Sequence, residues 1–255
     1  IMKSSSSVVI LIAIFFSILL SGCSRQENHQ VTENKLETLI EQLDHQIPKM
    51  QKQYDVPGVS IALIQKGELV WSNAYGYADL EHNKRMTVNS ICRAESISKS
   101  VTAWGVMKLV EDGLIDLDDP VEKYLDEWSF PKSEFDTKQV TIRRLLSANA
   151  GLPLGTIGKA TEYSPNSPMP SLKESLSEEA YLIKEPGSGF LYSNPGFNLL
   201  ELLIESFTKQ DFAIYMENEI LAPLGMSQAS FSWEEQYENS LPLGYELLGE
   251  PVYPY

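Results

Sequence analysis

The chain has 255 residues, of which 43% are hydrophobic and 10% aromatic. This composition excludes an intrinsically disordered, collagen-like or coiled-coil protein, and the length allows one sizeable core or two small ones. The 20 Lys and Arg residues against 35 Asp and Glu residues give a formal net charge of -15. So acidic a chain is not expected to bind nucleic acid, because phosphate backbones are bound through clustered Lys and Arg.

Residues 1–22 have the layout of a secretory signal peptide. Lys3 supplies a positive charge, and the apolar run at 8–20 is shorter than the roughly 20 residues that cross a membrane. The ending Leu-Ser-Gly-Cys resembles the lipobox of bacterial lipoproteins. It implies cleavage before Cys23, lipidation of its sulfur and anchoring to the outer face of a bacterial cell membrane, with residues 23–34 as a polar tether. The alternative is an ordinary signal peptide followed by a chance cysteine.

The first part of the mature chain predicts a helix and a hairpin. Leu and Ile residues recur at helical spacing over residues 33–52, which indicates an amphipathic helix kinked near Pro48. Two apolar, β-branched runs follow at 59–65 and 68–75. Because Lys66-Gly67 joins them, they predict a β-hairpin.

The rest of the chain is predominantly helical by its pattern. Residues 97–112 are apolar on almost every side, so we expect a buried helix that ends at Gly113. Further helices are expected near residues 120–126, 141–148, 174–183, 197–207 and 212–221. Residues 153–170 are rich in Pro, Gly and Ser, and so long a connection is usually functional or disordered. No composition break separates a second domain, so one domain is expected over residues 35–255.

Ser96 and Lys99 form an S-x-x-K tetrad at the start of the helix predicted at 97–112. Because three residues make almost one helical turn, the hydroxyl and the amine share one face. Desolvation on a helix with little polar surface disfavours the ammonium form, so the amine becomes a proton acceptor for the hydroxyl. Such a pair activates a serine nucleophile without a histidine. The alternative role for Ser96 is that of a helix N-cap.

Two more tetrads show that this motif alone is weak evidence. One runs from Ser129 to Lys132 in an irregular, acidic stretch, and the other from Ser206 to Lys209 at the end of an amphipathic helix. Only Ser96 opens a helix that is expected to be buried.

A second motif, Tyr192-Ser193-Asn194, precedes the helix expected at 197–207. A phenol near a cationic lysine can ionise or relay a proton, and an amide beside it can hold a substrate carbonyl. The triplet from Tyr237 to Asn239 has the same spacing but lacks the Pro-Gly lead-in and the following helix. The alternative for Tyr192 is a loop tyrosine packed under its neighbours.

Together the two motifs resemble those of the serine β-lactamase and penicillin-binding-protein-like hydrolases. The resemblance is to the class C β-lactamase branch, which includes D-alanyl-D-alanine carboxypeptidases and esterases, and it extends from about Leu36 to Tyr245. It implies Ser96 as the acyl-accepting nucleophile, Lys99 and Tyr192 as the proton-transfer pair, and Asn194 as a substrate contact. It also implies an α/β (α+β) fold of the β-lactamase/transpeptidase type, with an antiparallel sheet, flanking helices and a helical subdomain.

The expected function is that of a serine hydrolase that forms an acyl-enzyme from a β-lactam, a D-alanyl cell-wall peptide or a small ester. The alternatives are a lipid-anchored penicillin or peptidoglycan sensor and a non-catalytic relative. No cofactor or metal is expected, because the chain lacks H-E-x-x-H, Cys-His and G-x-G-x-x-G patterns.

Two departures from the family pattern matter. Residues 148–151 read Ala-Asn-Ala-Gly where members often carry His-Thr-Ser-Gly. The family's third motif, Lys-Thr-Gly or His-x-Gly on an edge strand, has no match after Tyr192. In relatives that strand supplies one of two oxyanion-hole N–H groups, and losing such a donor costs about 10²–10³ in rate. We therefore expect a catalytic domain that lacks its C-terminal strands and is inactive or poorly folded by itself.

Overall fold

The computed structural model describes residues 35–155, 170–232, 240–245 and 251–252. The chain divides into two compact units, one formed by residues 1–90 with 241–254 and the other by residues 91–240. The predicted single domain therefore stays a prediction, and the signal peptide, Cys23 and the tether lie outside the described residues. Within the described ranges, no helix combines the length and apolarity needed to cross a membrane.

The first unit is built on the expected hairpin. Strands β1 (Gly58–Gln65) and β2 (Glu68–Asp79) pair antiparallel around the turn at Lys66-Gly67. The short strand β3 (Lys84–Arg85) extends the sheet in the order β1-β2-β3, and β4 (Gly244–Tyr245) pairs with β5 (Pro251–Val252). The hairpin prediction is confirmed, with β2 four residues longer than the apolar pattern indicates because it continues through Asp79 to pair with β3.

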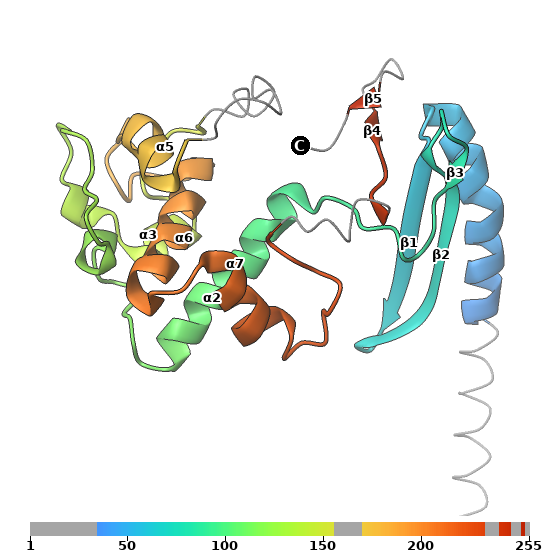
Figure 1. Ribbon diagram of the computed structural model, residues 1–255, viewed down its shortest axis with the longest axis horizontal. Helices are drawn as coiled ribbons and strands as arrows, with labels where there is room; N and C mark the ends of the chain where they lie inside the picture. The colour runs from blue at the N-terminus through green and yellow to red at the C-terminus, as the bar shows by residue number, and fades with distance from the viewer. Residues whose placement is uncertain (1–34, 156–169, 233–239, 246–250, 253–255) are drawn as a thin grey trace, which may run out of the picture. The chain divides into compact units, whose positions relative to one another are not determined.

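Residues 35–54 form the expected N-terminal helix, which continues through Pro48. The helix is joined to β2 by polar contacts, as the Asn73 amide donates to Asp44 Oδ1 at 3.1 Å and Gln51 Nε2 donates to the carbonyl of Tyr75 at 3.3 Å. These bonds fix the helix along the sheet within the first unit (Figure 1).

The second unit is helical and is centred on α6 (Asn194–Thr208). Its other elements are, in chain order, η1 (Glu95–Ile97), α2 (Ser98–Glu111), η2 (Val121–Tyr124), η3 (Thr137–Gln139), α3 (Ile142–Leu146), α5 (Leu172–Glu179), α7 (Phe212–Met216) and the π-helical turn η4 (Glu217–Leu221). Every helix expected from the sequence in this part of the chain is present, although the one near 120–126 is a 3₁₀ turn and most are shorter than expected.

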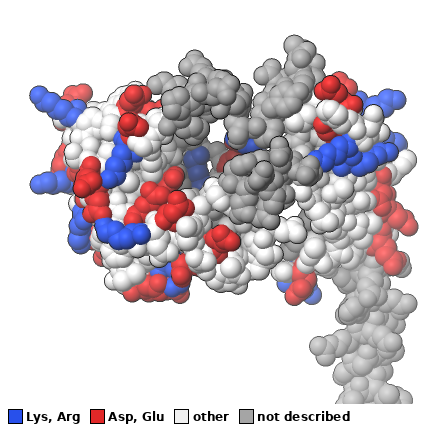
Figure 2. All heavy atoms as spheres, in the orientation of Figure 1, with Lys and Arg blue, Asp and Glu red and all other residues white. Residues whose placement is uncertain are grey.

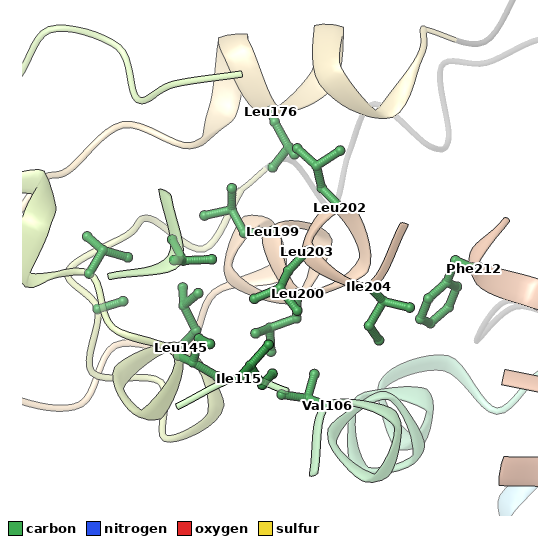
Figure 3. Close-up of a cluster of buried hydrophobic side chains, with 14 of the residues drawn as sticks. Val106, Ile115, Leu145, Leu176, Leu199, Leu200, Leu202, Leu203, Ile204 and Phe212 are labelled. Carbon is green, nitrogen blue, oxygen red and sulfur yellow. The ribbon is translucent and has the colours of Figure 1, made fainter. Parts of the chain in front are cut away.

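The core of the second unit forms around the apolar side chains of α6. Leu199, Leu200 and Leu203 are fully buried, and Figure 3 shows them between side chains from the surrounding elements, among them Leu145 of α3 and Val106 of α2. The amphipathic pattern of this helix therefore marks the centre of the core.

The helix at 97–112 differs from its expectation. Val106 and Leu109 of α2 are buried, but Trp104 is 49% exposed and Met107 is 42% exposed. The prediction of a buried helix therefore holds for one side of α2 only, because an apolar sequence shows that a face can be buried and not that a partner covers it.

Charge is distributed over the surface of both units. Figure 2 shows Asp and Glu side chains interspersed with Lys and Arg on the face in view. Arg143 forms a two-point contact with Asp118, and Lys123 pairs with Asp119. Such exposed pairs contribute little to stability individually.

Among the carboxylates of the helical unit that the structure describes, Glu201 is the one whose pKa is raised. Burial within α6, with smaller contributions from Glu205 and Asp211, raises its pKa from the ordinary 4.5 to about 7. The folded state thus binds this proton more tightly than the unfolded chain, and the stability it contributes is lost as pH rises from about 4 to about 7. Glu201→Gln should therefore raise the free energy of unfolding at pH 8 by about 3 kcal/mol.

Urea unfolding at pH 5 and pH 8 tests this expectation. The benefit of Glu201→Gln should be smaller at pH 5, where the native carboxyl is already protonated. The matched change Glu134→Gln, at an exposed position, should have little effect at either pH. Equal effects of Glu201→Gln at both pH values would contradict the assignment.

Candidate active site

Ser96 lies in the turn that leads into α2. It is the middle residue of η1 and is exposed. Glu95, directly before it, has φ of 47°, a left-handed conformation that is uncommon for a residue with a side chain and that clusters at functional sites. Ala94 and Ile97 occupy the N-cap positions of η1 and α2, so the N-cap alternative for Ser96 is wrong.

Three of the side chains singled out from the sequence meet at one oxygen. Lys99 Nζ donates to Ser96 Oγ at 3.2 Å, one turn along the chain as the tetrad predicts. Tyr192 Oη donates to the same Oγ at 2.7 Å, although it is 96 residues away in sequence. The alternative of a packed loop tyrosine is therefore wrong, since Tyr192 is 38% exposed and bonded through its hydroxyl.

The phenol of Tyr192 has a perturbed acidity. Its hydrogen bond with Ser96, followed by its hydrogen bond with Lys99, lowers the pKa of Tyr192 below the ordinary value of 10.0. The positive charge of Lys99 acts in the same direction, while burial opposes the shift. A phenol whose phenolate is stabilised in this way is a candidate proton acceptor for the serine hydroxyl.

The position of Lys99 is set by two aromatic rings. Its Nζ lies 5.0 Å from the centroid of the Tyr192 ring and 5.8 Å from that of Phe197 on α6, both within the range of a cation–π contact. The side chain is only half-buried and α2 keeps an exposed side. The sequence argument placed the amine on a buried helix with little polar surface, and the structure shows that this helix is buried on one side only. The contact with Phe197 was missed, although Phe197 follows Asn194 by one turn of α6.

Tyr192 is fixed relative to α6 by the residue that follows it. Ser193 is buried and its Oγ accepts the backbone N–H of Gly196 at 3.1 Å, which caps the helix. Pro195 then occupies the first turn, where a missing N–H costs nothing. Ser193 thus caps α6, and Tyr192 contributes its hydroxyl to the site.

Asn194 is the first residue of α6 and is half-buried. Its backbone N–H donates to the carbonyl of Leu154 at 3.0 Å. Within the described residues, no hydrogen bond joins its carboxamide to Ser96, Lys99 or Tyr192, so its role as a substrate contact stays a prediction.

The competing motifs have structural roles or lie elsewhere. Ser206 is buried and its Oγ accepts the backbone N–H of Asp126 at 3.2 Å, while Lys209 pairs with the carboxylate of Asp126. Ser129 is exposed and lies outside any helix, so its tetrad has no shared helical face. The triplet from Tyr237 to Asn239 lies outside the described residues.

No metal centre is assembled by the part of the chain that the structure describes, where no group of three or more His, Cys, Asp or Glu side chains is placed to hold an ion. The site thus consists of a hydroxyl, an ammonium and a phenol.

Comparison with known proteins gives a family match. The model of the family described as Beta-lactamase matches residues 36–245. The protein flp of Staphylococcus aureus (strain NCTC 8325 / PS 47) is 27% identical over 218 residues, which are 86% of this chain and 42% of that protein. Penicillin-binding protein 4* of Bacillus subtilis (strain 168) is 27% identical over 66% of this chain and 37% of its own length. The chain thus spans less than half the length of these relatives.

Solved structures share the fold. A penicillin-binding protein homologue from Pyrococcus abyssi, described as octameric, superposes with a TM-score of 0.70 and 31% identity over 84% of this chain and 50% of its own. A class C β-lactamase superposes with a TM-score of 0.68 over 84% of this chain and 56% of its own, at 20% identity. The expected β-lactamase/transpeptidase-like fold is therefore supported, with a mixed α/β chain and a small antiparallel sheet among its described residues.

Proposed function

Because the chain belongs to the Beta-lactamase family of serine β-lactamases and penicillin-binding proteins, we propose that it transfers an acyl group from an amide or ester carbonyl to Ser96 and then to water. The observation that carries the proposal is the convergence of Lys99 Nζ and Tyr192 Oη on Ser96 Oγ, at 3.2 and 2.7 Å. In this arrangement a weakly nucleophilic hydroxyl has a proton acceptor within hydrogen-bond reach, which is one way that enzymes activate a serine.

The proposed reaction follows from the roles of the three groups. Ser96 Oγ attacks the carbonyl carbon while its proton passes to the phenolate of Tyr192. The tetrahedral intermediate collapses when the C–N or C–O bond breaks, and the Tyr192 phenol protonates the departing amine or alcohol. Water then attacks the acyl-enzyme, with Tyr192 accepting its proton and returning it to Ser96 Oγ. Lys99 holds the phenolate and the serine oxygen, and the Ser96 N–H at the helix start is a candidate donor to the oxyanion.

The proposed substrates are β-lactams, D-alanyl peptides of the cell wall and small esters. The name of the Bacillus subtilis relative, penicillin-binding protein 4*, favours a penicillin as the first probe. The proposed location is the outer face of a bacterial membrane, with Cys23 lipidated, and it is supported by the Leu-Ser-Gly-Cys ending of residues 20–23.

Covalent labelling tests the function. The full-length protein is incubated with a fluorescent penicillin and, separately, with a fluorophosphonate, and the labelled peptide is identified by mass spectrometry. We expect one label per chain, on Ser96. Label on Ser129 or Ser206 would refute the assignment, as would equal labelling of Ser96→Ala.

The time course separates hydrolysis from sensing. Steady release of hydrolysed penicillin or ester after the first turnover supports a hydrolase. A stoichiometric burst without further release supports a sensor that is acylated and does not turn over. A folded full-length protein that neither probe labels would be a non-catalytic relative.

A further inference from the structure

Tyr192 reaches Ser96 from a loop without regular structure. Residues 180–193 contain no helix or strand, and α6 begins at Asn194. Much of this loop is not held by packing, since Phe190 is 73% exposed and Ile183 is 50% exposed. The geometry of the site therefore depends on what else restrains the loop.

Backbone hydrogen bonds from residues 148–154 supply most of that restraint. The N–H groups of Ile183 and Leu191 donate to the carbonyls of Gly151 and Ala148 at 3.0 and 2.7 Å. Gly151 must remain glycine here, because its φ is +79° and a Cβ would lie 2.1 Å from the carbonyl oxygen of Lys184. These bonds are made by backbone atoms, so most side-chain substitutions at 148–154 would leave them intact.

One side chain adds a specific bond close to Tyr192. The carboxamide Oδ1 of Asn149 accepts the backbone N–H of Gly189 at 3.0 Å, and the Asn149 carbonyl accepts that of Gly187 at 2.9 Å. The N–H of Asn149 donates to the carbonyl of Arg144 at 2.8 Å, which ties this residue to α3. Asn149 thus connects the core of the helical unit to the stretch between Gly187 and Gly189.

The two glycines explain why a side-chain acceptor is used there. Gly187 and Gly189 have φ values of +91° and +147°, conformations that L side chains rarely adopt. The N–H of Gly189 is bonded to the Asn149 carboxamide, whereas the N–H of Gly187 is bonded to the Asn149 carbonyl. Without that acceptor, the loop loses a fixed point at the partly buried N–H of Gly189, three residues before Tyr192.

We propose that Asn149 is a positioning residue for the active site, whose carboxamide holds the loop at Gly189 and thereby sets the distance between Tyr192 Oη and Ser96 Oγ. The inference rests on the proposed function and deepens it. It assigns a role to Asn149, which lies in the stretch where this sequence has Ala-Asn-Ala-Gly in place of the His-Thr-Ser-Gly expected from the resemblance. Misplacement of a reacting group by about 1 Å can cost 10²-fold in rate.

The test compares two changes at this position. Asn149→Leu keeps the approximate volume and removes the acceptor, whereas Asn149→Asp keeps an oxygen at the same place. Ser188→Ala is the matched control, because it removes another hydrogen bond of the same loop, that from Ser188 Oγ to the Glu185 carbonyl. Each variant of the full chain is first checked for cooperative thermal unfolding.

The first readout needs no catalysis. Ionisation of Tyr192 is followed by ultraviolet difference absorbance between each protein and the same protein carrying Tyr192→Phe. In the wild type and in Asn149→Asp, Tyr192 should ionise below the range of an ordinary tyrosine, because it remains against Ser96 and Lys99. In Asn149→Leu it should ionise at higher pH, since a displaced phenol loses both contacts.

The second readout is the rate of Ser96 acylation by the labelled penicillin as a function of pH. Asn149→Leu should lower that rate about 10- to 100-fold near pH 7, with its acidic limb moved to higher pH, and Asn149→Asp and Ser188→Ala should stay near the wild type. An unchanged Tyr192 titration in Asn149→Leu would overturn the inference. If Asn149→Leu does not fold, Asn149→Ala is measured in the same way and judged by the same outcomes. A wild type that shows the lowered Tyr192 titration but no label would count against the proposed function alone.

Discussion

Replacing Tyr192 by phenylalanine should lower the rate of Ser96 acylation about 10²- to 10⁴-fold at pH 7, the usual contribution of a general base. The change removes only the hydroxyl, whose oxygen lies 2.7 Å from Ser96 Oγ. The ring remains, so its contact with the Lys99 ammonium at 5.0 Å is retained. The loss should therefore report the hydroxyl, which contacts both Ser96 and Lys99, and not the ring contact with Lys99.

The pH dependence of the wild type follows from the direction of the Tyr192 shift. Contacts with Ser96 and Lys99 lower the pKa of Tyr192, so the phenolate is present at lower pH than for an ordinary tyrosine. The acylation rate should fall as pH drops below that pKa, because the phenol cannot accept the serine proton. In Tyr192→Phe this acidic limb should be absent.

The control for Tyr192→Phe is Tyr181→Phe, which removes a hydroxyl from another exposed tyrosine and should leave acylation unchanged. The measurement is the second-order rate of labelling by a fluorescent penicillin between pH 5 and pH 10. If Tyr192→Phe is acylated at the wild-type rate at pH 7, Tyr192 is not the proton acceptor.

The sequence predicted those features that depend on residues close together in the chain. Lys66-Gly67 between two β-branched runs located the hairpin, and the spacing from Ser96 to Lys99 placed a hydroxyl and an amine on one helical face. The apolar spacing of α6 identified a core helix. All three follow from local periodicity and turn chemistry.

The features that failed or were missed depend on contacts across long sequence separations. The exposed side of α2, which includes Trp104, could not be inferred, because the hydrophobicity of a side chain does not show whether another element covers it. The meeting of Tyr192 with Ser96 and Lys99, more than ninety positions away in the printed sequence, was implied by the family resemblance and not by any local pattern. The bond from Gly189 to Asn149 joins residues 40 positions apart.

Replacing Lys99 tests whether Tyr192 or Lys99 accepts the proton of Ser96. Lys99→Met should lower Ser96 acylation at pH 7 by about 10²-fold or more. Methionine removes the donor to Ser96 Oγ and both the hydrogen bond and the charge that lower the pKa of Tyr192. That pKa should therefore rise, and part of the lost rate should return as pH is raised and Tyr192 ionises.

The shift of the acidic limb distinguishes the two candidate proton acceptors. If Tyr192 accepts the proton, the limb in Lys99→Met moves to higher pH, and the double variant with Tyr192→Phe loses this recovery. If the amine of Lys99 accepts it, as the sequence alone suggested, Lys99→Met loses activity at every pH with no recovery. Lys108→Met, which removes an ammonium paired with Asp112 at the far end of α2, should match the wild type. Because both assignments predict a slow enzyme at pH 7, only the full pH profile separates them.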